Sequence, residues 1–499
     1  MQTVVSVKTM RESDAATIKS GTSGRELMYR AGKGVLESYA WKGPVAIVCG
    51  SGNNAGDGYV LALLLQERGI PCTVFLLFDR FSEDGRFYYD QCVEKGISIA
   101  HWQEKTDFSE FEEIVDCIFG TGFCGEVQNE ARAAIEAINQ SRKTVISVDI
   151  NSGLNGDSGI ASLCVKSDLT VSIGFYKSGH FLNQAKDVIG RLCNVDIGIG
   201  LYGKSYFLAE QADFTEVFGE RLQDSHKGAY GYVGILGGCR EYAGAVKLAN
   251  LSASALRAGA GVATLIVPQT LASSVSPYLL ESTLATIPDC DGKMLADLDR
   301  LDAILAGKKA LAVGMGWGSS PDYALILEHI LSTKELSLVI DADGLNTLAT
   351  MDQSLLKTTR CRVLLTPHLK EFERLSGYSI AQIRKDPIGC AEAYAHESGV
   401  CLLLKGPCTV VTNGNETILV NRGCAGMATA GSGDVLSGIL AGLLGYAPVS
   451  PRTAACGAYV AGLAGELAQA DKNPVSMLAS DTVSKISDAV SILLGKTDA

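Results

Sequence analysis

Short apolar runs, each followed by a glycine- or aspartate-containing loop and then by a longer apolar run, recur along the whole chain. The first clear example is PVAIVC at 44–49, followed by GSGNNAGDG at 50–58 and YVLALLLQERG at 59–69. Strands that alternate with helices at this spacing are typical of a doubly wound parallel sheet. The pattern therefore predicts the α/β fold class, with ligands bound beyond the carboxyl ends of the strands.

The alternation is interrupted once, by a polar stretch at 209–231. At 499 residues the chain is also too long for one compact domain. We therefore predict two different α/β domains, over residues 1–212 and 213–499. The second domain begins its alternation again at GYVGILGG, and it includes a long helix predicted over 245–261 and a hairpin predicted over 409–421.

Charge and cysteine usage restrict the class of partner. The chain has 43 Lys and Arg against 55 Asp and Glu, a net charge of −12, which argues against a nucleic-acid binder. No apolar run is long enough to span a membrane. The 15 cysteines have no metal-ligand spacing, which indicates reduced thiols. We expect a cytoplasmic homo-oligomer that binds small molecules and neither nucleic acid nor membranes.

Three polar loops follow strands in the first half. Residues 50–58 have glycines that let backbone N–H groups approach an anion at a helix N-terminus. Asp116 opens DCIFGTGFCGE and Asp149 opens DINSGLNGDSG. A tight turn or a helix cap is the alternative for each loop taken singly. Together they predict one site, in which oxygen groups of Asn54, Asp116 and Ser152 suit an alkali or alkaline-earth cation.

The second half has more loops of this kind. They are GGCREYAGA at 237–245, GMGWG at 314–318, DADGLN at 341–346, TPHLKEFERL at 366–375 and GMATAGSGDVLSG at 426–438. The last resembles an anion-binding loop at a helix start, but no lysine follows its glycines as in a Walker loop. His368 is a candidate site residue, and Lys405 is either a surface lysine or a phosphate contact.

In these motifs and their order, the chain resembles the bifunctional NAD(P)H-hydrate repair enzymes. In that family an N-terminal hydrate epimerase is fused to a C-terminal ADP-dependent hydrate dehydratase with a ribokinase-like fold. GNNAGDG, DCIFGTG and DINSGLNGDSG resemble the epimerase signatures, and the loops of the second half resemble the dehydratase signatures. The resemblance implies a Rossmann-like epimerase domain over 1–212 and a ribokinase-like dehydratase domain over 213–499.

The resemblance also implies site residues in the first domain. A potassium ion would be held by Asn54, Asp116 and Ser152, and Asp149 would be the catalytic acid or base. The hydrated nicotinamide nucleotide would contact Asn53, Asn54, Ala55, Gly56, Asp57, Gly120, Thr121, Gly122, Phe123, Cys124, Gly125, Glu126 and Asp149.

In the second domain the resemblance implies a reaction in which ADP drives removal of water from the S hydrate, with Mg²⁺ accompanying the nucleotide. Asp434 would be the general base. The hydrated cofactor would contact Ala245, Gly316, His368 and Asp434. The adenine nucleotide would contact Lys405, Gly406, Pro407, Cys408, Thr409, Gly431, Ser432 and Gly433, the last three forming an anion hole with their backbone amides.

The chain departs from the family pattern at four places. Asn151 replaces the usual proline before Ser152, Cys239 replaces a serine, GMGW replaces GPGL, and Lys370 replaces a glycine. Two alternative functions remain open at this point. One is a ribokinase-like vitamin or sugar kinase, since the fold does not determine the substrate. The other makes the first domain a non-catalytic nucleotide-binding module.

Overall fold

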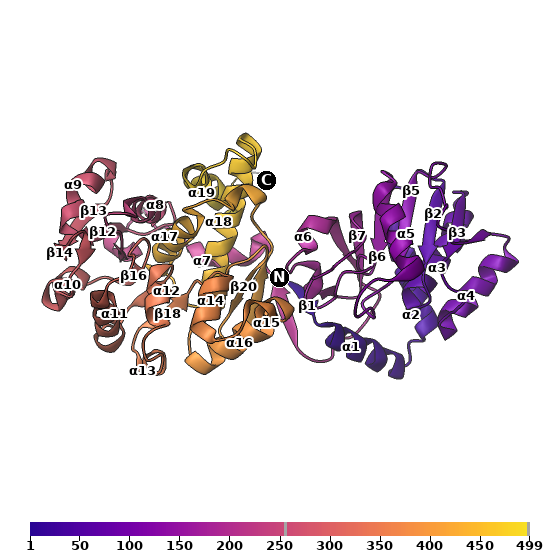
Figure 1. Ribbon diagram of the computed structural model, residues 1–499, viewed down its shortest axis with the longest axis horizontal. Coiled ribbons are helices and arrows are strands. Elements are labelled where there is room, and N and C mark those ends of the chain that lie inside the picture. Colours follow the sequence, from indigo (N-terminus) through magenta and orange to yellow (C-terminus); the bar gives the residue numbers. More distant parts are fainter. Residues whose placement is uncertain (254–256, 497–499) are drawn as a thin grey trace. The chain divides into compact units, whose positions relative to one another are not determined.

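The computed structural model describes residues 1–253 and 257–496. The chain divides into two compact units, Thr3–Tyr206 (the N-terminal unit) and Met1–Gln2 with the chain from Phe207 onward (the C-terminal unit). This division precedes the boundary predicted at 212/213 because β10 (Ser205–Leu208) pairs through Phe207 and Leu208 with β21 (Thr417–Val420) of the C-terminal unit. Figure 1 shows helices and strands alternating in both units, which confirms the predicted α/β class.

The helices and strands of the N-terminal unit follow the predicted alternation. In chain order they are β1 (Gln2–Val5), α1 (Val7–Lys19), α2 (Gly24–Glu37), β2 (Val45–Cys49), α3 (Asn53–Glu67), β3 (Cys72–Leu76), α4 (Glu83–Glu94), β4 (Ser98–His101), β5 (Glu113–Cys117), α5 (Asn129–Gln140), β6 (Thr144–Val148), β7 (Ser167–Ile173), β8 (Tyr176–Lys177), α6 (Ala185–Val188) and β9 (Ile189–Val195).

A seven-stranded parallel sheet forms the centre of the N-terminal unit, in the order β4-β3-β2-β5-β6-β7-β9. Both faces of β2 are covered, because Val45 and Ile47 pack with α2 and α3, whereas Ala46 and Val48 pack with α5. The strand order reverses between β2 and β5. Ligands of open α/β sheets bind at such a reversal, so the loops after these two strands are where a site is expected.

The C-terminal unit continues from β10. Its further elements are α7 (Thr215–Phe218), β11 (Tyr232–Leu236), α8 (Ala243–Ala253), β12 (Val262–Pro268), α9 (Ala272–Val275), β13 (Thr283–Ile287), β14 (Asp289–Cys290), β15 (Lys293–Met294), α10 (Leu298–Leu305), β16 (Ala310–Val313), α11 (Pro321–Thr333), β17 (Ser337–Ile340), α12 (Asp343–Leu348), α13 (Leu355–Thr358), β18 (Arg362–Leu365), α14 (Leu369–Ser376), α15 (Ile380–Lys385), α16 (Pro387–Ser398), β19 (Cys401–Leu404), β20 (Thr409–Thr412), β21, α17 (Ser432–Leu444), α18 (Pro451–Asp471) and α19 (Ala479–Leu493). Residues 254–256 of the helix predicted over 245–261 lie outside the described residues.

The main sheet of this unit has the order β13-β12-β11-β16-β17-β18-β19-β20-β21-β10. Its strands are parallel from β13 to β19, and β20 runs antiparallel to both neighbours, which confirms the predicted hairpin. The strand order reverses between β11 and β16. Helices α8, α17, α18 and α19 cover one face of the sheet with a continuous apolar core. A second candidate site is therefore expected at the loops after β11 and β16.

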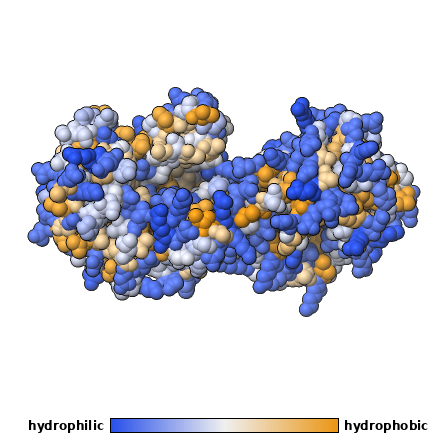
Figure 2. Space-filling model, viewed as in Figure 1, coloured by the Kyte–Doolittle hydropathy of each residue, from blue (hydrophilic) through white to orange (hydrophobic). Residues whose placement is uncertain are grey.

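The face of the molecule drawn in Figure 2 is mainly hydrophilic. On the face shown in Figure 2, hydrophobic residues are scattered among hydrophilic ones. Among the helices at 1–253 and 257–496, none is both long and apolar enough to cross a membrane. The central strands are strongly apolar, since runs such as SLVI in β17 and CLLL in β19 are buried along their whole length. Such continuous burial is typical of parallel strands covered on both faces.

Candidate active sites

A cavity of about 680 Å³ lies at the strand reversal of the N-terminal unit. Its walls come from the loop after β2 with the start of α3, the loop after β5, the end of β6, and helices α1 and α2. The predicted site residues that line it are Asn53, Asn54, Asp57, Gly120, Thr121, Gly122, Phe123, Cys124 and Asp149. Three segments that are distant in the sequence thus converge on one site, as their strand-end positions predict.

Four predicted contact residues do not line this cavity. Ala55 and Gly56 lie within the first turn of α3 and face the protein interior. A Cβ at Gly56 would lie 2.4 Å from the Met28 sulfur, so this glycine permits close packing of α3 on α2. Gly125 and Glu126 are exposed beyond the lining of the cavity. The predicted contacts of Gly125 and Glu126 with the nucleotide therefore stay predictions.

Asp149 is held by a buried lysine. The Lys177 ammonium lies 2.5 Å from Asp149 Oδ1, and it also donates to Ser172 Oγ and to the Ile173 carbonyl. The Thr121 N–H donates to Asp149 Oδ2 at 3.0 Å. Burial opposes ionisation of Asp149, but the Lys177 charge and these hydrogen bonds hold its pKa below the usual value. Asp149 is therefore an ionised carboxylate that faces the cavity.

The backbone at Asp149 is also constrained. Its φ is +66°, which is uncommon for a residue with a side chain. His180 accepts from the Lys177 N–H through Nδ1, and its Nε2–H donates to the Asp149 carbonyl at 2.8 Å. Burial and the Lys177 charge lower the pKa of His180 to about 3, so the ring is neutral. A strained residue that is fixed from both sides is typical of functional sites.

Asp57 faces the same cavity from α3, and its electrostatic environment is opposite to that of Asp149. Burial, together with the charges of Asp149 and Asp14, raises the pKa of Asp57 well above its usual value. Its carboxyl has no hydrogen bond or ion pair within residues 1–253 and 257–496. Of the four carboxyls that line the cavity, Asp149 is thus stabilised as an anion, whereas Asp57 favours the protonated form.

The predicted cation ligands lie beside this cavity. Asp116 is fully buried at the end of β5 and accepts from Ser152 Oγ at 2.5 Å, from the Ser152 N–H at 2.9 Å and from Ser147 Oγ at 2.9 Å. Burial raises the pKa of Asp116, and these hydrogen bonds oppose that rise. Asn54 is buried, and neither its Oδ1 nor its Nδ2 has a partner in the described structure.

Asn151, which replaces the family's proline, anchors the loop that carries Ser152. Its Nδ2 lies within 2.9–3.0 Å of the Val165 carbonyl, Ser167 Oγ and the Val188 carbonyl. Its Oδ1 accepts from Thr170 Oγ1 at 2.5 Å. The side chain is completely buried, and these contacts hold the loop in place. The departure at position 151 is therefore compensated by a network of hydrogen bonds.

A second cavity, of about 1000 Å³, lies at the strand reversal of the C-terminal unit. The predicted residues Ala245 and Gly316 line it, together with Tyr242, Asp343 and Asn346. Gly316 has φ of +64°, and a Cβ there would lie 2.6 Å from the Tyr242 carbonyl. The loop after β16 can therefore approach the loop after β11 only because position 316 is a glycine.

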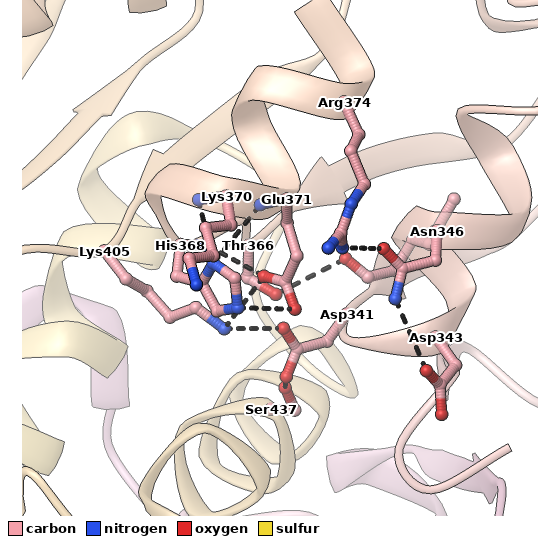
Figure 3. Close-up of polar contacts among 11 residues, drawn as sticks. Asp341, Asp343, Asn346, Thr366, His368, Lys370, Glu371, Arg374, Lys405 and Ser437 are labelled. Carbon is pink, nitrogen blue, oxygen red and sulfur yellow. Dashed lines mark hydrogen bonds and ion pairs between the residues drawn. The ribbon is translucent and has the colours of Figure 1, made fainter. Parts of the chain in front are cut away.

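Beside this cavity a lysine and two acidic side chains form a network (Figure 3). Lys405, which follows β19, donates to Asp341 Oδ1 at 2.8 Å, and Glu371 Oε2 lies 3.8 Å from the same ammonium. Ser437 of α17 donates to Asp341 Oδ2 at 2.6 Å. Burial opposes ionisation of both partners, but the pKa of Asp341 stays below its usual value and that of Lys405 above. The pair is ionised.

Asp434 lies in the first turn of α17, a helix whose N-terminus has no side-chain cap. Its N-cap residue Gly431 has φ of +95°, a conformation that favours glycine. Burial and the negative charge of Asp341 raise the pKa of Asp434 to about 7, against the opposing effect of Lys405. The first N–H groups of a helix have no intrahelical acceptor. The Ser432 N–H donates to the Thr429 carbonyl. The site therefore combines the backbone donors of a helix start, a nearby cation and a carboxyl suited to proton transfer near neutral pH.

His368 has a clear structural role at the start of α14. Its ring Nδ1 accepts from the backbone N–H groups of Lys370 and Glu371, and its backbone N–H donates to Glu371 Oε2 at 2.8 Å. This reciprocal pattern is a capping box. The other ring nitrogen lies 3.3 Å from Glu371 Oε1, and half of the side chain is exposed. His368 can therefore contact a ligand through its exposed edge while it caps the helix.

The predicted nucleotide loop, residues 405–409, connects β19 to β20. Gly406 and Pro407 are exposed, whereas the Cys408 side chain is buried. A ligand at this loop could therefore reach Cys408 only through its backbone. Lys405 lies close to the other predicted nucleotide segment, because a Cβ at Gly433 would lie 3.4 Å from its ammonium. The structure thus brings together residues 405 and 433, which are far apart in the sequence.

The sequence interpretation assigned no role to Lys177, Asp14, Asp341 or Glu371. Asp341 and Glu371 lie inside quoted motifs, so their position after strands was an available signal. Lys177 comes shortly after β7, which ends at Ile173, but a lysine at a strand end is usually exposed. Its complete burial and its contact with Asp149 depend on the tertiary fold.

Comparisons with known proteins agree with this geometry. The family described as "NAD(P)H-hydrate dehydratase" matches residues 233–488, and "YjeF-related protein N-terminus" matches residues 24–179. A bifunctional NAD(P)H-hydrate repair enzyme of Moorella thermoacetica is 35% identical over 480 residues, which are 91% of this chain and 90% of that protein.

Solved structures resemble the C-terminal part of the chain. An ADP/ATP-dependent NAD(P)H-hydrate dehydratase of Bacillus subtilis, crystallised with ATP and Mg²⁺, has a TM-score of 0.51 and 25% identity, and the match covers 58% of this chain and 99% of that one. A ribokinase-like superfamily protein of Enterococcus faecalis has a TM-score of 0.50 and 24% identity, covering 59% and 98%. The predicted ribokinase-like fold is confirmed. The chain belongs to the family of bifunctional NAD(P)H-hydrate repair enzymes.

Proposed function

We propose that the chain repairs hydrated NADH and NADPH in two steps. The N-terminal unit interconverts the R and S hydrates, and the C-terminal unit dehydrates the S hydrate with ADP, giving NAD(P)H, AMP and phosphate. Family membership and one candidate cavity in each unit support this assignment. The observation that carries the dehydration step is the Asp434 carboxyl at the uncapped start of α17, beside Lys405.

The dehydration chemistry explains why this arrangement is needed. Hydroxide is a poor leaving group near neutral pH, whereas phosphate leaves readily once the hydroxyl has been phosphorylated. Asp434 takes the proton from the attacking hydroxyl, and its pKa of about 7 suits a general base. The backbone N–H groups of Gly433 and its neighbours, with the positive end of the α17 dipole, stabilise charge on the phosphoryl group in transit.

The adenine nucleotide would occupy the loop at 405–409 and the helix start at 431–433. Lys405 is already ionised by its pairing with Asp341, so it can face phosphate without a further change of protonation. No cluster of three or more His, Cys, Asp or Glu side chains within the described ranges could hold a metal ion. Mg²⁺ would accordingly enter with the nucleotide phosphates, to which it usually binds with several waters.

The N-terminal unit fits a potassium ion. Asn54 Oδ1 is buried without a partner, and the buried Asp116 carboxylate has no ion pair within the described residues. A Cβ at Gly120 would lie 3.3 Å from Asn54 Cβ, so Asn54 lies against the loop that follows Asp116. Asn54, Asp116 and Ser152 would hold the ion, which supplies a compensating charge and orders the loop around the substrate.

Asp434→Asn tests the dehydration step. Purified variant and wild type receive the S hydrate of NADH with ADP and Mg²⁺, and NADH is followed by its near-ultraviolet absorbance. We expect NADH formation to fall at least ~1000-fold while ADP binding, measured by calorimetry, changes less than ~3-fold. The exposed Asp299→Asn in the same unit is the matched control. Loss of ADP binding in a folded Asp434→Asn protein would refute the general-base role.

The same assay separates repair from a small-molecule kinase. A kinase releases a stable phosphoester of a vitamin or sugar alcohol, whereas the repair enzyme releases inorganic phosphate and NADH. Phosphorylation of such an alcohol, with no turnover of the hydrate, would refute the proposal.

We further propose that the protein is a homo-oligomer in the cytoplasm. None of the fifteen cysteines, all of which lie among the described residues, forms a disulfide, which suits a reducing compartment. Light scattering measures the oligomeric state.

A further inference from the structure

Asp14, Asp57, Asp84 and Asp149 line the N-terminal cavity, and two of them, Asp149 and Asp57, lie under opposite electrostatic conditions. The negative charge of Asp149 is compensated by the Lys177 ammonium, which lies 2.5 Å from Oδ1, and by the Thr121 N–H, which donates to Oδ2 at 3.0 Å. Asp57 lines the same cavity, and its carboxyl has no hydrogen bond or ion pair within the described ranges. A pair of titratable groups with such different surroundings can divide the roles of base and acid between them.

Lys177 cannot itself be the acid. Its side chain is completely buried and does not line the cavity. The N–H groups of its ammonium point to the Asp149 carboxylate, to Ser172 Oγ and to the Ile173 carbonyl. Lys177 therefore acts through Asp149, as a positioning residue that keeps this carboxylate ionised.

The groups that face Asp57 explain why it holds a proton. Burial raises its pKa most, the charges of Asp149 and of Asp14 in α1 raise it further, and the charge of Lys177 opposes them. Arg11 of α1 and Asp84 of α4 line the same cavity. The pKa of the nearby Cys117 thiol is raised well above its usual value by burial, so this thiol stays neutral. The negative surroundings thus outweigh Lys177, and the pKa of Asp57 lies well above its usual value.

Epimerisation of a hydrated nicotinamide needs both an acid and a base. Addition of water to the 5,6 double bond makes C6 a hemiaminal carbon, bonded to the ring nitrogen N1 and to a hydroxyl. When the C6–N1 bond breaks, the hydroxyl loses its proton and C6 becomes an aldehyde, while N1 gains a proton. Rotation about C5–C6 and the reverse reaction then give the other epimer.

We propose that Asp149 is the base and Asp57 the acid of this ring opening, an inference that rests on the proposed epimerase function. Asp149 takes the proton from the C6 hydroxyl as the C6–N1 electron pair moves to N1, and Asp57 donates its proton to N1. Ring closure reverses both transfers, so the two carboxyls return to their starting states. No oxidant or further reactant is required.

Asp57→Asn tests the proposal in the full-length protein. The readout is NADH formation with ADP, started either from the R hydrate, which must first be epimerised, or from the S hydrate. We expect the kcat of epimerisation to fall ~100-fold or more, with KM changed less than ~3-fold and the rate from the S hydrate unchanged. The loss of epimerisation at high pH, which reports deprotonation of the acid in wild type, should disappear. Asp90→Asn, an exposed carboxylate paired with Arg86, is the control.

Thermal denaturation separates catalysis from folding. Because Asp57 has no partner, its replacement by the isosteric Asn should leave the melting temperature unchanged or raise it. A large fall in melting temperature, or an epimerase rate reduced equally at every pH, would indicate a structural role and overturn the proposal. A wild-type rate from Asp57→Asn would also overturn it. If wild type itself gives no acceleration over spontaneous epimerisation, the proposed epimerase function fails instead.

Discussion

Lys405→Met should destabilise the centre of the C-terminal sheet through the charge that it leaves behind. Asp341 is 2% exposed and its carboxylate is paired with Lys405 at 2.8 Å. Removal of one partner of a buried ion pair destabilises by about 3–5 kcal/mol. Lys405 is 21% exposed, so the lower end of that range applies, about 3 kcal/mol. A free-energy change of about 1.4 kcal/mol corresponds to a tenfold change in an equilibrium constant, so amide exchange in this region should accelerate ~100-fold.

Hydrogen exchange followed by mass spectrometry measures this effect locally, which matters because a chain with two units need not unfold in one step. The peptide to follow contains β17, which ends directly before Asp341. The effect should depend on pH. With Lys405 present the pKa of Asp341 is below its usual value, and without it burial raises that pKa. Protonation of Asp341 then relieves the unpaired charge, so the ratio of variant to wild-type exchange should shrink between pH 8 and pH 5.

Two further variants complete the test. Lys405→Met with Asp341→Asn removes both charges and should recover more than half of the lost protection. Lys485→Met breaks a lysine–aspartate pair whose Asp471 is 57% exposed, and it should change exchange less than ~3-fold. Exchange in β17 within threefold of wild type for Lys405→Met would refute the buried-pair argument. An effect of the same size at pH 5 and pH 8 would refute its electrostatic origin.

Three other predictions follow from the same contacts. Asn151→Ala removes the buried hydrogen bonds that anchor the Ser152 loop, and calorimetry should show the N-terminal unit less stable by about 2–4 kcal/mol; a change below ~0.5 kcal/mol contradicts this. Asp434 has a raised pKa, so the native state binds its proton more tightly and stability falls as pH rises from about 4 to about 7; Asp434→Asn should flatten that fall in melting temperature, and an unchanged slope contradicts it. Replacing K⁺ by Li⁺ at equal ionic strength should slow epimerisation ~10-fold or more without affecting dehydration, whereas equal slowing of both would argue against an ion at Asn54.

The sequence by itself determines the fold class and the order of the loops. Both units show the predicted alternation of buried strands with helices, since this alternation depends on the local periodicity of apolar residues. Asp116 lies at the end of a strand, Asp149 directly after one, and Asn54 and Asp434 at helix starts, so their sequence positions predict the strand-end edge where ligands bind. The same reasoning could not say that Ala55 and Gly56 face the interior, because neighbouring residues of one helix turn point in different directions.

Only the tertiary structure decides which charges meet and which of them is protonated. Lys177 reaches Asp149 because β6 and β7 are neighbouring parallel strands, so the residues that follow β7 lie beside the end of β6. Complete burial of Lys177 makes its ammonium the partner of this one carboxylate. Asp57 and Asp434 differ from Asp149 and Asp341 only in their surroundings, because all four of these residues carry the same carboxyl side chain. Protonation depends on burial and on charges that are distant in the sequence, so the acid and base roles follow from the fold.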